Sequence, residues 1–510
     1  MEEIGDGEDR ISELPIQIIH DILRRIRRQY GLKEEARTCI LSKTWSSIWR
    51  SRPEVIINQS IHNSFMNSTE KFVKFVDDSL RSHVEQNLRI EILRLINLRL
   101  PELASHIDRW LNLAIKHNVR SLEIHPTSNF SYCIPDAIYA AKTLTELSLN
   151  KCNFEIDNNN STTNKLQRII STCPFIRDLK IGHCTGIQNL HVFGLVNLEK
   201  LELRMCKKLA KVEIWAPNLR KFVYVGVPLD EHSGTTEPEP LPCTIDILDG
   251  YNTLECLQLE ATTMTDKQFE YQLSKFPALK VLKLKRCYVM KNIKVVSENL
   301  KSFTLSHWGN LEQVNMLAPN LMEFNFQGYI MPFSISTMDP SNLERANLDF
   351  YVQQSDDSYN FGDVDTSWYN NLLDFVQKFN YSNGLILIIC CEESILIYED
   401  PSEILVPPTR KLELCIENSS MHLESFVNEM MFSQPMTVSI VHGMDSKILQ
   451  AFSETTKEYR MKQYKRLNEV IIHKGVTEDG GTSCLNSWLK STSLIERITT
   501  FMFKWEEPPN

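Results

Sequence analysis

Leu198-Glu199-Lys200-Leu201-Glu202-Leu203 is the stretch of sequence that decides the fold. Its last four residues alternate between charged and apolar side chains, as a strand with one buried face does. The same Leu-x-x-Leu-x-Leu pattern begins at eight other places along the chain: Leu144, Ile176, Leu219, Leu254, Leu279, Leu300, Leu321 and Leu343. A segment that recurs this often predicts a repeat architecture rather than several independent domains.

The spacing of these segments indicates the kind of repeat. The last four starts lie 21, 21 and 22 residues apart, which is the period of a leucine-rich repeat. An alternating apolar segment such as 209–214 precedes the next start and predicts a short extended piece on the outer face. Two longer intervals contain the polar segments 157–164 and 228–242, which we interpret as surface loops. The expected fold is therefore α/β, an irregular leucine-rich-repeat solenoid whose parallel strands form a curved horseshoe.

Cysteine placement tests this register independently. Eight residues after four of the starts come Cys152, Cys184, Cys206 and Cys287. In a leucine-rich repeat this position lies at the turn out of the strand, where small buried side chains pack in a ladder. A zinc site is the alternative, but the chain has no Cys-x-x-Cys pair, and His183 lies at the same repeat turn. We therefore interpret these cysteines as packing residues.

Side chains between the buried leucines of each strand face the concave surface of such a solenoid. The residues there are polar and change sign along the array: Glu202, Arg204, Gln258, Glu260, Lys283, Lys285, Thr304, Ser306, Asn325 and Gln327. A mixed surface suits recognition of a folded protein or a peptide, with an acidic patch of the target opposite Lys283 and Lys285. The candidate substrate-binding residues are Glu202, Arg204, Glu260, Lys283 and Lys285. A merely solvated surface is the alternative for each of them.

Between residues 9 and 52 the apolar spacing becomes helical. Pro15 suits the first turn of a helix, because its missing N–H would have no partner there. A second helix is expected over residues 33–40, and Ser42 can cap a third over residues 43–49. Three short helices bury little surface, so the module should lean on a partner or on the next domain. A cap over the open end of the repeat array would need the same pattern.

The same module resembles a known motif. Ile11-Ser12-Glu13-Leu14-Pro15, followed by residues 36–45 and Trp49, is similar to the F-box of plant F-box proteins. The resemblance implies docking, through the Leu-Pro turn and helical apolar residues, onto a Skp-type adaptor of a cullin–RING ubiquitin ligase. The adaptor contacts that it carries over are Leu14, Pro15, Ile18, Ile19, Ile22, Leu41, Ser42 and Trp45.

One departure from this motif lies at the end of the first helix, where Arg24, Arg25, Arg27 and Arg28 make the chain unusually basic. Basic side chains near a helix C-terminus interact favourably with the helix dipole. A solvated face therefore explains all four.

The resemblance to plant F-box/leucine-rich-repeat proteins extends from about residue 9 to about residue 350, because residues 72–77 and 108–124 look like the linker and first repeats. Many members of that family end in an FBD segment, but this chain does not match its pattern. From residue patterns alone, the last third predicts strands over 385–390, 410–416 and 437–441 and helices over 367–379 and 423–431. The expected division is a disordered segment 1–8, an F-box 9–52, a helical linker 53–118, irregular leucine-rich repeats 119–365, and C-terminal strand/helix repeats with a cap 366–510.

Composition limits the function. The chain has 55 Lys and Arg against 65 Asp and Glu, a net charge of -10, which argues against nucleic acid or an anionic membrane as the main partner. The N-terminus has no apolar signal-like segment and no stretch is long enough to span a membrane, so we expect thirteen reduced cysteines in the cytoplasm or nucleus. A phosphate loop, a nucleophile elbow and a His-Glu-x-x-His motif are absent. We therefore expect no catalysis, metal or cofactor.

Two functions fit these features. The first is the substrate-recognition subunit of an SCF-type cullin–RING ubiquitin ligase, which binds the adaptor through the F-box and a target protein through the repeats, and raises the local concentration of that target. The alternative is a leucine-rich-repeat interaction or regulatory protein outside any ligase, with a helical N-terminal cap. The two differ in adaptor binding.

Overall fold

The computed structural model describes residues 13–60, 68–85, 89–99, 102–127, 131–155, 165–227, 243–248, 253–308, 311–328, 332–334, 336–339 and 341–350, together with Phe375 and the backbone of five strands between residues 385 and 505. The chain divides into two compact units, Met1–Asn218 and Leu219–Asn510, and each is described by itself.

The first unit begins with three short helices and continues with strands and helices in alternation. Its helical elements are α1 (Ile16–Tyr30), α2 (Leu32–Arg37), η1 (Thr38–Ile40), α3 (Lys43–Arg50), α5 (Thr69–Glu85), α6 (Ala104–Lys116), η2 (Asp136–Ala140) and α7 (Lys165–Thr172). Its strands are β1 (Glu54–Asn58), β2 (Ile92–Leu98), β3 (Ser121–Pro126), β4 (Tyr132–Cys133), β5 (Glu146–Asn150), β6 (Cys152–Asn153), β7 (Asp178–Gly182), β8 (Asn189–Val192), β9 (Lys200–Arg204) and β10 (Lys211–Ile214).

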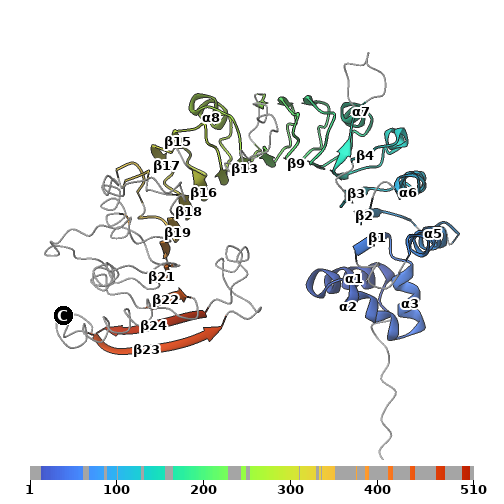
Figure 1. The fold of residues 1–510 in the computed structure, drawn as a ribbon, viewed down its shortest axis with the longest axis horizontal. Coiled ribbons are helices and arrows are strands. Elements are labelled where there is room, and N and C mark those ends of the chain that lie inside the picture. Colours follow the sequence, from blue (N-terminus) through green and yellow to red (C-terminus); the bar gives the residue numbers. More distant parts are fainter. Residues whose placement is uncertain are drawn as a thin grey trace, which may run out of the picture. The chain divides into compact units, whose positions relative to one another are not determined.

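Six of these strands form one parallel sheet in the order β1-β2-β3-β5-β7-β9. Helices α5, α6 and α7 lie along one side of it in Figure 1. Leu198, Leu201 and Leu203 of the deciding stretch are all buried, because a parallel strand covered on its inner face places alternate residues in the core. Each of these leucines stabilises the fold by about 1.5–3 kcal/mol through burial.

The second unit continues the same architecture. It contains helix α8 (Asp266–Leu273) and strands β11 (Lys221–Val225), β12 (Thr244–Ile247), β13 (Cys256–Glu260), β14 (Val281–Lys285), β15 (Asn292–Val296), β16 (Ser302–Trp308), β17 (Gln313–Leu317), β18 (Glu323–Gly328) and β19 (Arg345–Phe350). Strands β11, β13, β14, β16, β18 and β19 pair in that order, all parallel. The predicted solenoid of stacked repeats is confirmed.

The C-terminal strands extend this sheet. They are β20 (Leu385–Ile389), β21 (Leu412–Ile416), β22 (Thr437–His442), β23 (Leu467–Val476) and β24 (Arg497–Trp505). The first three confirm the predicted strands and are parallel, whereas β24 pairs antiparallel with both β22 and β23, a closing hairpin that the sequence pattern did not predict. The helices predicted over 367–379 and 423–431 lie outside the described residues, apart from Phe375, which is buried against Phe333.

The outer segments of the repeats are mixed. The extended piece predicted over 209–214 is confirmed as β10, which pairs parallel with β8. Helices α7 and α8 were not predicted. The outer segment of every repeat was expected to be a short extended piece, as in the shorter repeat that contains residues 209–214. A capping box of Thr265 and Gln268 begins α8, and this Thr-x-x-Gln signal is visible in the sequence.

The cysteine ladder is confirmed as a packing feature. Cys152, Cys184, Cys206 and Cys287 are buried, and each thiol donates to the carbonyl two residues earlier, as Cys287 Sγ does to Lys285 O at 3.2 Å. The residue before each cysteine has a left-handed backbone, with φ near 50° at Lys151, His183, Met205 and Arg286. This turn directs the cysteine inward, so His183 and Cys184 form no reactive pair.

Burial predicts how these thiols react. Desolvation raises the pKa of Cys287 to about 12, whereas Cys133 is exposed on β4. Because only the thiolate is nucleophilic, we expect iodoacetamide at about pH 8 to alkylate Cys133 in the native protein and Cys287 only after unfolding. Peptide mass spectrometry before and after addition of denaturant measures both rates. Equal native rates at the two positions would contradict the burial of the ladder.

A second ladder joins neighbouring repeats. The residue directly before the repeat leucine donates its side chain to a backbone carbonyl of the preceding repeat, as Asn320 Nδ2 does to Glu298 O at 2.7 Å and Asn218 Nδ2 to Val196 O at 2.7 Å. Thr143 and Thr253 do the same with their hydroxyl groups. These bonds satisfy carbonyls that the strands leave unpaired and hold the repeats in register.

Candidate partner-binding surfaces

The N-terminal module has its own small core. Ile19 and Leu23 of α1 pack against Trp45 and Ile48 of α3, with Trp49 at the edge. Ser42 caps α3 as predicted, because its hydroxyl accepts a hydrogen bond from Trp45 N at 3.1 Å. Side chains of α1 and α3 together therefore form the hydrophobic core of the module.

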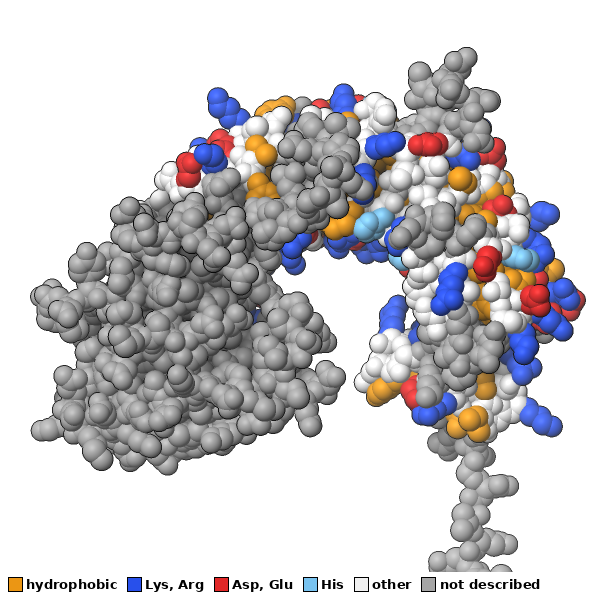
Figure 2. All heavy atoms as spheres, in the orientation of Figure 1, with side chains coloured by type: hydrophobic (Ala, Val, Ile, Leu, Met, Phe, Trp, Pro, Cys, Tyr) orange, Lys and Arg blue, Asp and Glu red, His pale blue; other side chains and the backbone are white. Residues whose placement is uncertain are grey.

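Other apolar side chains of the module point outward. Leu14, Pro15, Ile16, Ile18, Ile40 and Leu41, here called the module's apolar surface, are all exposed, and Ile40 is 84% exposed. Figure 2 shows hydrophobic side chains among basic ones over this part of the chain. Exposed apolar side chains at several positions of so small a module can be covered by another protein.

The structure separates the predicted adaptor contacts into two groups. Leu14, Pro15, Ile18 and Leu41 lie on the apolar surface, and Ile22 is half-buried. Ile19 and Trp45 are buried in the core and Ser42 serves as a helix cap, so these three support the surface from within. The sequence did not identify Ile16 and Ile40 as surface residues. The helical spacing of apolar residues does not distinguish these exposed side chains from the buried ones beside them.

Buried charges connect this module to the first repeat. Arg24 and Arg27 both pair with the carboxylate of Glu54 on β1, and Glu35 lies 3.7 Å from Arg27 and 3.4 Å from Arg52. We call these five residues the junction network. The prediction of a solvated face is wrong for Arg24 and Arg27, because β1 brings a carboxylate against them. Arg25 and Arg28 are exposed as predicted.

The junction network shifts the acidity of its carboxylates in opposite directions. Burial raises the pKa of Glu35, against the opposing effect of Arg52 and Arg27. Burial would also raise the pKa of Glu54, but the charges and hydrogen bonds of Arg27 and Arg24 outweigh it and hold that pKa below its ordinary value. Arg52 also stacks over the Trp49 ring, at 3.9 Å from its centroid. The junction network therefore links α1 to β1 through Glu54, and α2 to Arg27 and Arg52 through Glu35.

The predicted substrate-binding residues lie on the strands in two groups. In the first unit, Glu202 and Arg204 of β9 contact each other at 3.3 Å. In the second unit, the strand register places Glu260 directly beside Lys285, and Glu260 also lies 3.7 Å from Arg286. Lys283 stands between Gln258 and Thr304 in the adjacent row. Glu260, Lys283 and Lys285 thus lie on the neighbouring strands β13 and β14, and their role in binding a substrate stays a prediction.

The first strands carry a polar cluster that sequence reasoning missed. Arg94 Nε lies 3.1 Å from a carboxylate oxygen of Glu123, and His125 Nε2 lies 3.1 Å from Ser148 Oγ. Burial lowers the pKa of His125, with Glu123 opposing the shift and Lys180 adding to it. The sequence analysis named concave-face residues only from β9 onward. The corresponding alternate positions of β2, β3 and β5 follow from the same repeat pattern.

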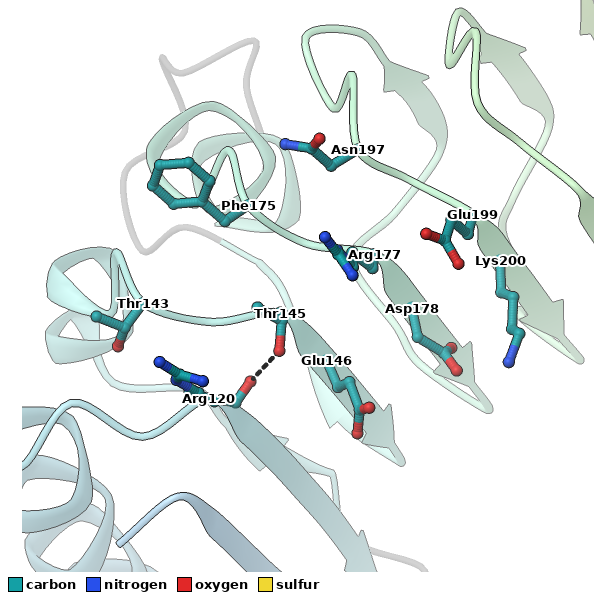
Figure 3. A pocket seen from close by; sticks show the side chains of 10 residues that line it. All are labelled: Arg120, Thr143, Thr145, Glu146, Phe175, Arg177, Asp178, Asn197, Glu199 and Lys200. Carbon is teal, nitrogen blue, oxygen red and sulfur yellow. Dashed lines mark hydrogen bonds between the residues drawn. The ribbon is translucent and has the colours of Figure 1, made fainter. Parts of the chain in front are cut away.

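A groove of about 830 Å³ lies where strands β3, β5, β7 and β9 begin. Three rows of side chains line it, and Figure 3 shows them on the segments that lead into successive strands and on the first residues of those strands. We call it the strand-start groove; its lining residues are Arg120, Thr143, Thr145, Glu146, Phe175, Arg177, Asp178, Asn197, Glu199 and Lys200. Sequence reasoning did not name it, because it read only the strands and not the residues before them.

In the part of the chain that the structure describes, no group of three or more His, Cys, Asp or Glu side chains is placed to hold a metal ion. No helix within the same residues combines the length and apolar character that a membrane span requires.

Comparisons with known proteins agree with this architecture. The family model described as "At1g61320/AtMIF1, LRR domain" matches residues 80–235 and 243–359, which is just over half of the chain. In Arabidopsis thaliana, F-box protein At5g03100 is 24% identical over 43% of this chain and 71% of its own length. Putative F-box/FBD/LRR-repeat protein At4g03220 is 26% identical over 42% of this chain and 51% of its own length. F-box/LRR-repeat protein At3g03360 is 22% identical over 59% and 62% respectively. The chain thus spans less than two thirds of the latter two relatives.

Proposed function

Since this chain belongs to the leucine-rich-repeat family described as At1g61320/AtMIF1, and its plant relatives are F-box/LRR-repeat proteins, we propose that it is a substrate receptor of an SCF-type cullin–RING ubiquitin ligase. The module of α1 to α3 binds a Skp-type adaptor, and the repeats bind the protein to be modified. The chain itself performs no covalent step and acts in the cytoplasm or nucleus.

The observation that supports this proposal best is the module's apolar surface. Leu14, Ile18 and Leu41 stay exposed although the module has a complete core of its own. A helical cap that only covered the repeats would turn such side chains toward them, because exposed apolar area gains nothing in water. An adaptor helix or loop that buries the surface recovers that free energy.

Adaptor binding tests the proposal directly. We expect the double variant Leu14→Ala, Pro15→Ala to weaken binding to a purified plant Skp-type adaptor by about 2 kcal/mol or more, roughly 30-fold, because both side chains are interface anchors. Isothermal titration calorimetry with the full chain measures the loss. Ile40→Ala provides a second variant that leaves the first turn of α1 unchanged.

The matched control is Leu317→Ala. Leu317 is 66% exposed on β17, outside the module, so its removal should leave adaptor affinity unchanged. Thermal unfolding of the repeats should be unchanged in all three variants. Absence of wild-type binding would instead favour a repeat interaction protein with a helical cap.

A further inference from the structure

The strand-start groove is built from the repeat itself. Its floor is the row of residues directly before the strands: Arg120, Thr145, Arg177 and Glu199. The backbone carbonyls of the first three accept from the next repeat, as Arg120 O does from Thr145 N at 2.8 Å and Thr145 O from Arg177 N at 2.7 Å. One wall is Thr143, Phe175 and Asn197. The other is formed by the first residues of β5, β7 and β9, namely Glu146, Asp178 and Lys200. The groove therefore runs across the strands, with one rung per repeat.

The charges of this groove are unevenly satisfied. Glu146 accepts a hydrogen bond from Ser121 at 2.8 Å, and Asp178 lies 3.4 Å from Lys180. Within the described residues, by contrast, neither Arg120 nor Arg177 has an ion-pair partner. The groove is formally balanced, and Glu199 at the far end of the floor also has no ion-pair partner among the described residues, so the cationic part of the floor is the stretch from Arg120 to Arg177.

The spacing of the two arginines indicates what fits between them. Arg120 and Arg177 are two rungs apart, and neighbouring parallel strands lie about 4.8 Å apart, so their backbones are separated by roughly 10 Å. An extended polyproline-II segment advances about 3.1 Å per residue with three residues per turn, so its residues i and i+3 lie on the same side about 9 Å apart. Carboxylates at those positions would meet the two guanidinium groups, which bind carboxylate through paired hydrogen bonds.

We propose that the strand-start groove binds an extended acidic peptide segment of a partner protein, with carboxylates three residues apart on Arg120 and Arg177. Phe175 is 56% exposed at the wall and offers an apolar surface to the residues between the two acids. The proposal depends on the proposed function only in one respect, namely that the partner is the protein to be ubiquitinated.

The test uses the full chain and a defined probe. The probe is a fluorescein-labelled proline-rich peptide with two glutamates three positions apart, measured by fluorescence anisotropy at low salt. A second peptide has the two glutamates adjacent, and a third has glutamine in both places. We expect the first peptide to bind at least about tenfold more tightly than the other two, and less tightly as salt rises.

Variants place this binding in the groove. Arg120→Gln, Arg177→Gln should weaken binding of the first peptide at least about tenfold, whereas Arg220→Gln should not. Arg220 precedes β11 as Arg120 precedes β3, but it does not line the groove. Thermal unfolding should be the same in all proteins, since neither groove arginine has an ion-pair partner among the described residues. Equal binding of the three peptides, equal binding by the double variant, or no binding would overturn the proposal.

The adaptor does not enter this assay, so the two proposals can fail separately. Peptide binding without adaptor binding would retain the groove and remove the ligase function. Adaptor binding without peptide binding would retain the ligase function and place substrate recognition elsewhere on the repeats.

Discussion

Replacing Glu54 by glutamine is expected to lower the free energy of unfolding of the N-terminal module by about 3 kcal/mol. The carboxylate of Glu54 is buried and pairs with both Arg24 and Arg27. The substitution keeps the shape of the side chain but removes the buried counter-charge that the two guanidinium groups share, leaving Arg24 the exposed Asp21 and Arg27 Glu35 at 3.7 Å. Breaking a buried pair typically costs about 3–5 kcal/mol, and we expect the low end of that range because each arginine keeps a second carboxylate. Urea unfolding followed by the fluorescence of Trp45 and Trp49 measures the loss.

The matched control is Asp21→Asn, which removes a different partner of Arg24. Asp21 Oδ1 lies 2.8 Å from Arg24 Nη1, but this carboxylate is exposed. Exposed pairs are worth about 0–1 kcal/mol, so this variant should unfold almost like the wild type. An equally small effect at Glu54 would show that the junction network contributes no stability.

The pH dependence gives an independent reading of the same network. Because the pKa of Glu54 lies below its ordinary value of 4.5, the ionised carboxylate stabilises the folded state fully above that pH. This contribution is lost as the pH falls through the lower folded pKa, and the glutamine variant has no such contribution to lose. We therefore expect the difference in unfolding free energy between the two proteins to shrink below about pH 4.5. A difference that stayed constant as the pH fell well below about 4.5 would contradict the assignment.

Replacing Trp110 by alanine is expected to cost about 3–5 kcal/mol, the usual range for deletion of a buried large aromatic side chain. Trp110 is 1% exposed on α6, its ring packs edge-on against Phe72 of α5, and its Nε1 donates to Asp77 Oδ1 at 2.7 Å. The variant leaves a cavity between two helices and removes a hydrogen bond to a partly buried carboxylate. Chemical denaturation of the full chain measures the change.

Two further variants separate the causes. Trp110→Phe retains most of the ring and loses the N–H donor, so about 1–3 kcal/mol of the cost should remain. Trp215→Ala removes a tryptophan that is 46% exposed and should change stability by less than about 1 kcal/mol. If Trp215→Ala lowered the free energy of unfolding as much as Trp110→Ala, packing between α5 and α6 would not explain the loss.

The repeat register is the part of this fold that could be predicted most completely. Leucines at fixed spacing specify which side chains are buried, and the same spacing placed the cysteine ladder before any contact was known. Periodicity succeeds here because every rung repeats one local geometry. The helices α1 and α3 were predictable from local signals, since Pro15 and Ser42 mark their starts.

Features that depend on contacts between distant segments could not be predicted this way. Arg24 and Arg27 have the sequence signature of a solvated helix end, and only the arrival of Glu54 from β1, about thirty residues later, makes them structural. The same limit applies to Ile19 and Ile18, which are neighbours on one helix but lie in the core and on the surface respectively. Which face of α1 is covered depends on where α3 packs. The strand-start groove was missed because its lining residues belong to no motif.

The parallel strands of the first unit stack at a regular spacing, so the distance between two positions in that unit depends on the number of strands between them. The junction network fixes the module to β1, and the strand-start groove begins at Arg120, two rungs further along at β3. A partner bound in that groove is therefore separated from a partner of the module by a fixed number of strand spacings. Insertion or deletion of a repeat between them would shift the partner in steps of about 4.8 Å, each accompanied by the twist between neighbouring strands. Under the proposed function, repeat number rather than linker flexibility would set the distance and angle between the adaptor and a protein bound in the groove.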